Sequence, residues 1–107
     1  MYKLVFFVPE SHLEQVKTAV FAAGAGCIGH YDQCCWQTIG QGQFRPLSDA
    51  NPFIGQVNKL ETLTEYRVEM VCAEEYIRQV VSALRESHPY EAPAFDVVQV
   101  VELEGDL

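Results

Sequence analysis

The chain has 107 residues, the length of one domain, and 49% of them are hydrophobic and 21% charged. This composition is ordinary for a globular protein and excludes a disordered or collagen-like chain. Seven basic residues stand against 15 acidic ones, for a net charge of −8, so the chain lacks the basic surface that nucleic-acid backbones require. We predict a single domain over residues 1–107, with an acidic tail from about residue 102, that does not bind nucleic acid.

The opening of the chain predicts a strand, a helix and a glycine stop. Residues 2–8, YKLVFFV, are almost continuously apolar, which is typical of a central strand buried on both faces. Ser11 and Glu14 have the spacing of a capping box, and Gly24 and Gly26 are placed to end the helix that follows. Its apolar face is formed by Leu13, Val16, Val20 and Ala23.

The middle of the chain predicts three strands. Residues 31–39 are rich in aromatic and small residues, and GQGQF at 40–44 is a candidate turn into a short strand at 44–47. Residues 60–72 alternate with a period of two, with Val68 and Met70 at even positions and Glu65 and Glu69 at odd ones. This alternation predicts a strand with one face toward a core.

The last third predicts a helix over 74–87 and a final strand over 95–101. Pro89 ends the helix, because a proline disfavours helical geometry in the residue before it. The segment after Pro93 is β-branched, which favours a strand. The helical spacing is carried by Ile77, Val80, Val81 and Leu84.

With the short segment at 44–47 counted as part of a hairpin in the middle, the predicted order is βαββαβ, which is an α+β, ferredoxin-like pattern with two helices on one face of an antiparallel sheet. The other face has no cover of its own, and aromatic side chains such as Tyr31 and Trp36 are candidates for it. We therefore predict that this face is buried against further copies of the chain.

The connection over residues 40–60 is the most unusual stretch, because long segments without regular structure are commonly functional. One interpretation is a binding loop, in which Gly40, Gly42 and Gly55 let the backbone approach a ligand and Arg45 offers a charged group. The alternative is an ordered surface connection held by Asn51 and its neighbouring prolines.

The segment HPYEAPAF, residues 88–95, brings together an imidazole, a phenol and a carboxylate on His88, Tyr90 and Glu91. One interpretation is a shared site. The alternative is a helix exit whose direction is set by two prolines.

A third cluster contains His30, Cys34 and Cys35, which are suitable ligands for copper or zinc. The alternative is that these cysteines pack as small apolar side chains. The chain has no P-loop, Ser-His-Asp order or H-E-x-x-H pattern, so catalysis has no direct support.

The apolar runs and the cysteines indicate where in the cell the protein is located. The longest early apolar run, residues 4–8, is too short for a membrane span or a secretory signal. We expect a cytoplasmic protein with no membrane partner, whose four cysteines are reduced.

Three long motifs resemble one known family. GAGCIGHYDQCCWQTIGQGQFRPLSDANPFIG, LETLTEYRVEM and HPYEAPAFDV resemble the domain inserted in many bacterial proteins of the NGG-interacting-factor family, and the match runs from about residue 2 to 101. Those proteins carry a dinuclear metal site and are often named type 2 GTP cyclohydrolase I. The inserted domain is similar in fold to PII signalling proteins and CutA-like divalent-cation-tolerance proteins, which assemble as trimers with ligands in clefts between subunits.

The resemblance implies a homotrimer with clefts lined by the 40–60 connection and residues 88–91. The family's metal ligands lie in the two halves that flank the insertion, and His12, His30 and His88 match no such motif. Neither the metal site nor the hydrolase activity is therefore carried over, and no cofactor is expected.

Three functions remain open. The first is a non-enzymatic, cytoplasmic, trimeric binding or sensor module for a small ligand. The second is a divalent-metal-binding or tolerance protein, with a soft site built from His30, Cys34 or Cys35, or a harder one from His88 and Glu91. The third is a hydrolase with a site between subunits, in which His88 is the acid-base and Glu91 orients it. The candidate ligand-binding residues are Tyr31, Trp36, Gly40, Gly42, Phe44, Arg45, Asn51, His88, Tyr90 and Glu91.

Overall fold

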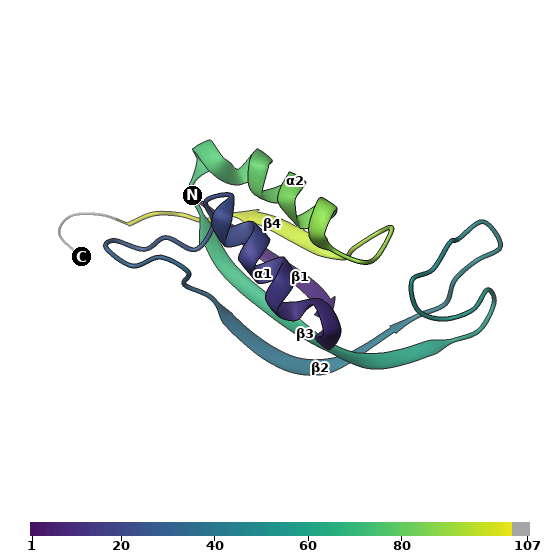
Figure 1. Ribbon diagram of the computed structural model, residues 1–107. Coiled ribbons are helices and arrows are strands. Elements are labelled where there is room, and N and C mark those ends of the chain that lie inside the picture. Colours follow the sequence, from purple (N-terminus) through teal and green to yellow (C-terminus); the bar gives the residue numbers. More distant parts are fainter. Residues whose placement is uncertain (104–107) are drawn as a thin grey trace.

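The computed structural model describes residues 1–103, which form a four-stranded sheet with two α-helices on one of its faces (Figure 1). The βαββαβ order and the ferredoxin-like α+β class predicted from the sequence are confirmed. The end of the predicted acidic tail, residues 104–107, lies outside the described residues. The elements are β1 (Tyr2–Pro9), α1 (Leu13–Ala22), β2 (Trp36–Phe44), β3 (Glu61–Cys72), α2 (Ile77–Ser87) and β4 (Phe95–Gln99).

The sheet has the strand order β2-β3-β1-β4, and every neighbouring pair is antiparallel. Phe6 lies opposite Val68, so the even-numbered residues of β1 and β3 share a face. Since side chains alternate along a strand, the odd-numbered residues, including Phe7 and Glu65, share the opposite face. The helices cover the even face.

The core lies between the helices and this even face. Phe6, Val68 and Leu84 are fully buried there, as the predicted periodicities require. The helical faces predicted for α1 and α2 are confirmed by the burial of Val16, Val20, Val80 and Leu84. Burial of large apolar side chains is the main stabilising contribution in a domain of this size.

The predicted capping box at the start of α1 is wrong. A single 3₁₀ turn, Glu10–His12, precedes α1, and no side chain caps the helix. The Ser11 hydroxyl instead lies 2.8 Å from Nδ1 of His12. The turn places Ser11 inside the helical entry rather than before it, so its oxygen does not reach the backbone N–H groups of the first turn.

The predicted strand at 31–39 is confirmed only from Trp36 onward, and the short strand predicted at 44–47 is wrong, because residues 45–47 form no strand. Tyr31 forms only an isolated bridge to Ile28, and Gln33 has a φ of 55°, which interrupts extended structure. The GQGQF segment is the second half of β2 instead of a turn, because it pairs with the first half of β3 as far as Phe44 opposite Glu61. A long-range partner therefore overrides the local turn signal of its two glycines.

The pair β2–β3 extends beyond the rest of the sheet. Residues 61–64 of β3 pair only with β2, because β1 reaches only as far as Glu65. The 45–60 connection leaves this extended end and lies near the segment that joins α2 to β4 (Figure 1). Two segments distant in sequence thus meet at one end of the sheet.

The uncovered face of the sheet is partly charged and partly apolar. Lys3 and Arg67 form ion pairs with Glu69 at 3.7 and 2.9 Å. Trp36 and Val98 remain 62% and 54% exposed on the same face. Within residues 1–103, no helix is long and apolar enough to cross a bilayer.

Candidate functional site

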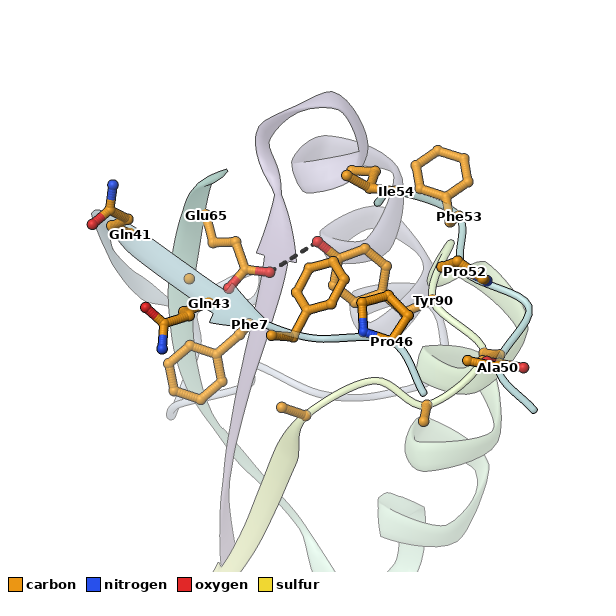
Figure 2. Close-up of a pocket in the computed structure, with 15 residues that line it drawn as sticks. Phe7, Gln41, Gln43, Pro46, Ala50, Pro52, Phe53, Ile54, Glu65 and Tyr90 are labelled. Carbon is orange, nitrogen blue, oxygen red and sulfur yellow. Dashed lines mark hydrogen bonds between the residues drawn. The ribbon is translucent and has the colours of Figure 1, made fainter. Parts of the chain in front are cut away.

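A pocket of about 460 Å³ lies at the extended end of the sheet (Figure 2). Its walls come from the end of β2, the 46–54 part of the connection, and residues 90–94 after α2. This volume is within the usual range for small-molecule sites. Four aromatic rings line it: Phe7, Phe44, Phe53 and Tyr90.

The main polar contact in the pocket joins Tyr90 to Glu65. The Tyr90 hydroxyl donates a hydrogen bond of 2.9 Å to Oε2 of Glu65 (Figure 2). Burial raises the pKa of the Tyr90 phenol well above its usual value, and the hydrogen bond and charge of Glu65 raise it further. Tyr90 therefore stays protonated near neutral pH and acts as a fixed donor to the carboxylate.

Gly42 leaves room for the Glu65 carboxylate. A Cβ atom at Gly42 would overlap the carboxylate oxygen Oε1 of Glu65. Gly40 lies on the same strand and the same face, and no atom lies within 4 Å of the place where its Cβ would be. Only the glycine at 42 is thus required by a neighbouring side chain.

Gly42→Ala is expected to displace the Glu65 side chain and break its hydrogen bond to Tyr90, with a loss of about 1 kcal/mol of unfolding free energy. Gly40→Ala is the matched control and should be neutral or slightly stabilising, because glycine weakens a strand interior. Urea denaturation of both variants checks this expectation. Equal stability of the two would contradict the role given to Gly42.

His88 is a structural link between α2, β1 and the pocket wall. It is only 6% exposed, and its Nε2 lies 2.7 Å from the carbonyl oxygen of Phe7. The backbone N–H of Tyr90 donates to Nδ1 at 3.1 Å. Nδ1 must therefore be unprotonated, which places the ring hydrogen on Nε2. Burial lowers the pKa of His88 and outweighs the opposing effects of the Phe7 carbonyl and Glu65.

This geometry corrects the acid-base role that the sequence suggested for His88. Both ring nitrogens are engaged with the backbone, and the ring is not part of the pocket lining. Glu91 does not orient it either, since Oε1 of Glu91 accepts the backbone N–H of Asn51 at 2.9 Å. The helix-exit interpretation of this segment describes His88 better.

The 45–60 connection is an ordered segment that also forms a pocket wall. Its hydrogen bond from Asn51 to Glu91 ties it to the segment after α2. Pro46 is buried, and the backbone N–H of Asn58 donates to the Pro46 carbonyl at 2.7 Å. The two interpretations of this connection are therefore compatible, because its order is what shapes the pocket.

The predicted site residues separate into three groups. Gly42, Phe44, Tyr90 and Glu91 line the pocket, and Asn51 and His88 lie directly behind it. Gly40, in β2, and the exposed Arg45, directly after β2, are close in sequence to lining residues but do not line the pocket themselves. The third group lies toward the opposite end of β2 and comprises the exposed residues Tyr31 and Trp36.

Two central residues of the pocket, Glu65 and Phe7, were not among those predicted from the sequence. Glu65 lies at an odd position of β3, where the alternation predicted a solvated or partner-facing side, and Phe7 lies in β1, which was predicted to be buried on both faces and so gave no sign of a pocket. Phe53 was also missed, although it lies within the connection singled out above. No local signal distinguishes Glu65 from the other acidic residues of β3.

The proposed soft metal site does not assemble among residues 1–103. In this part of the chain no three His, Cys, Asp or Glu side chains are grouped to hold a metal ion. His30 and Cys35 are exposed, and the Cys34 thiol contacts the Asp32 carbonyl at 3.6 Å. All four cysteines are free.

Nearly all of this chain matches one part of longer proteins of known name. No family model matches it. It is 44% identical over 105 residues to the Mycobacterium leprae protein named GTP cyclohydrolase 1 type 2 homolog, and the match covers 98% of this chain and 27% of that protein. A crystal structure of a Bacillus cereus protein related to NIF3 has a TM-score of 0.81 at 36% identity, covering 94% of this chain and 26% of that one. The chain thus spans about a quarter of these relatives and resembles a single domain within them, which confirms the resemblance found in its motifs.

A second likeness concerns the fold alone. The PII-like protein CutA from Nostoc sp. PCC 7120, in apo form, has a TM-score of 0.66 at 18% identity, covering 94% of this chain and 81% of that one. The PII/CutA-like fold is therefore confirmed.

Proposed function

We propose that this chain is a non-catalytic, PII/CutA-like binding module that holds a small ligand in the pocket beside Glu65 and Tyr90. The observation that carries the proposal is the pocket itself, about 460 Å³ in volume and walled by four aromatic rings. Pockets of this size with a few convergent polar groups are the usual form of small-molecule sites.

Binding is preferred to catalysis because the titratable groups around the pocket have structural partners. Glu65 accepts from Tyr90, Glu91 accepts from Asn51, and both nitrogens of His88 are engaged. The cyclohydrolase of the relatives' name is not proposed for this domain, because the chain corresponds to about a quarter of their length. A cytoplasmic location is part of the proposal and is supported by the four free cysteines.

A homotrimer is also part of the proposal. Trp36 and Val98 expose apolar surface on the uncovered face, which association with further copies would bury. The resemblance to PII and CutA-like proteins supports three copies. Light scattering of the pure protein should give about three times the chain mass of 12.1 kDa, and a monomer at micromolar concentration would contradict this part.

A pocket-blocking variant tests the binding proposal. A thermal-shift panel of amines, nucleotides, small acids and divalent metals should contain a compound that raises the Tm, since a ligand at about 100 times its Kd adds about 2.7 kcal/mol. Ala92→Trp fills the pocket from an exposed lining position and should abolish the shift. Ala22→Trp, exposed on α1 outside the lining, is the control and should keep it. A shift that persists in Ala92→Trp would contradict the proposal.

A further inference from the structure

We infer that the pocket selects an organic cation, an ammonium or guanidinium group attached to an apolar body. The cationic group would lie at the Glu65 carboxylate, and the apolar body would lie among the rings of Phe44 and Phe53. This inference rests on the proposed function and names the ligand class of the same pocket.

The charge of the lining supports a cation. The charged side chains of the lining are Glu65 and Glu91, and the described residues contribute no Lys, Arg or His to it. His12 contacts the Phe53 ring at 5.3 Å between centroids but does not line the pocket. A phosphate or carboxylate ligand would face two carboxylates without a compensating charge, which disfavours it.

Glu65 lacks the counter-charge that Glu69 on the same strand has. Glu69, four residues further along the same face, pairs with both Lys3 and Arg67. Among residues 1–103, Glu65 forms no ion pair, and its described hydrogen bond is the neutral one from Tyr90. An ionised carboxylate has about four acceptor positions, so one oxygen and part of the other are available to a donor. A cationic donor gives the stronger, charge-assisted bond.

The rings around the carboxylate favour the same ligand. The Tyr90 ring centroid lies 6.0 Å from that of Phe44 and 6.5 Å from that of Phe53, with tilted planes. Ring faces carry partial negative charge and attract cations within about 6 Å. Phe7 already makes such a contact on its neighbouring side, with the Arg67 guanidinium 5.9 Å from its centroid, and that guanidinium is held by Glu69.

A metal ion fits this pocket less well than an organic cation. Divalent ions require several oxygen, nitrogen or sulfur ligands together, and the described part of the chain groups no three acidic, His or Cys side chains. An ammonium group needs one carboxylate and ring faces, which is what the pocket offers.

Three probes of one shape test the ligand class. These are 2-phenylethylamine (a cation), 2-phenylethanol (neutral) and phenylacetate (an anion), titrated into the full chain and followed by NMR or calorimetry. We expect the amine to bind about tenfold more tightly than the alcohol, and phenylacetate to bind more weakly than both. Glu65→Gln should remove the preference for the amine and change the affinity for the alcohol less than about twofold.

Glu75→Gln is the matched control, because it removes the same charge from an exposed position outside the pocket. It should keep the full preference for the amine. Added salt should weaken binding of the amine and leave that of the alcohol unchanged, because salt screens the charge. The titrations with added salt use the wild-type chain, so they are independent of any folding defect in Glu65→Gln.

The outcomes separate this inference from the proposed function. Equal affinities for amine and alcohol, a preference that survives Glu65→Gln, or no binding of the amine at millimolar concentration would each overturn the cation inference. If the alcohol still binds the wild-type chain and Ala92→Trp abolishes that binding, the pocket remains a site for a ligand of another class. Amine binding that persists in Ala92→Trp would place the cation outside the pocket and overturn the inference.

Discussion

Alanine at Gly26 is expected to lower the free energy of unfolding by about 3 kcal/mol, from backbone strain and overlap together. Gly26 has a φ of 84°, and a Cβ there would lie 2.7 Å from the Phe21 ring. The residue also joins three parts of the fold: its N–H donates to the Val71 carbonyl, and its carbonyl accepts from Cys34, both at 2.8 Å. Side-chain overlap at this point therefore disturbs the junction of α1, β3 and the segment before β2.

Gly29→Ala separates backbone strain from overlap. Gly29 also has a positive φ, of 57°, but no atom lies within 4 Å of the position its Cβ would take. Gly29→Ala should lower the free energy of unfolding by about 1 kcal/mol. Urea denaturation of the two variants, with the slope of the transition checked for two-state behaviour, measures the difference. Equal losses would mean that the contact with Phe21 is unimportant.

His88→Gln is expected to lower the free energy of unfolding by about 2 kcal/mol near pH 7.5. The physical reason is that the Phe7 carbonyl and the Tyr90 N–H, both in or beside the pocket wall, lose the partner that fits them. The pocket should loosen with them, since Tyr90 is held by its backbone bond to His88 and its hydroxyl bond to Glu65.

The same variant should also flatten part of the pH dependence of stability. Burial lowers the pKa of His88 below its ordinary value of 6.5. The unfolded chain therefore takes up the proton first as the pH falls, so the contribution of neutral His88 is complete above about pH 6.5 and declines below it. Wild type should lose more stability than His88→Gln between pH 7.5 and 5.5.

His30→Gln is the control for this pH effect, because His30 is exposed. It should keep the wild-type dependence in denaturation curves recorded at both pH values. If His88→Gln retains the wild-type slope, the lowered pKa of His88 does not contribute to stability.

Periodicity predicted the ferredoxin-like fold because it reports which face of an element is buried. The alternation from residue 66 to 72 and the helical spacing of Val80 and Leu84 both correspond to observed burial, whereas the even positions from 60 to 64 are exposed. The glycines predicted the ends of elements correctly at one place and wrongly at another. Gly24 and Gly26 end α1 with positive φ values, whereas the glycines of GQGQF lie within β2. The difference arises because the first pair is set by the local helix end and the second by pairing with β3.

The candidate site was only partly predictable. Tyr90 and Glu91 were predicted as site residues because their functional groups are close in sequence. Phe44 and Gly42 were predicted because they belong to the unusual 40–60 connection. Glu65 was not predicted, because its role depends on Tyr90, which is 25 residues away. For His88 the sequence left a reactive group and a helix exit both open, because nothing local reveals that its two nitrogens are engaged with distant and neighbouring backbone.

The sequence by itself determined the order of the elements, the buried face of each helix and of the second half of β3, and the acidic character of the chain, because each depends on spacing or composition within one segment. Tertiary structure alone decided the extent of β2, the engagement of His88, and the meeting of Glu65 with Tyr90 and of Asn51 with Glu91. Those features require contacts between residues far apart in the chain. Such contacts form when the whole sheet and its helices pack together, and no local pattern encodes them.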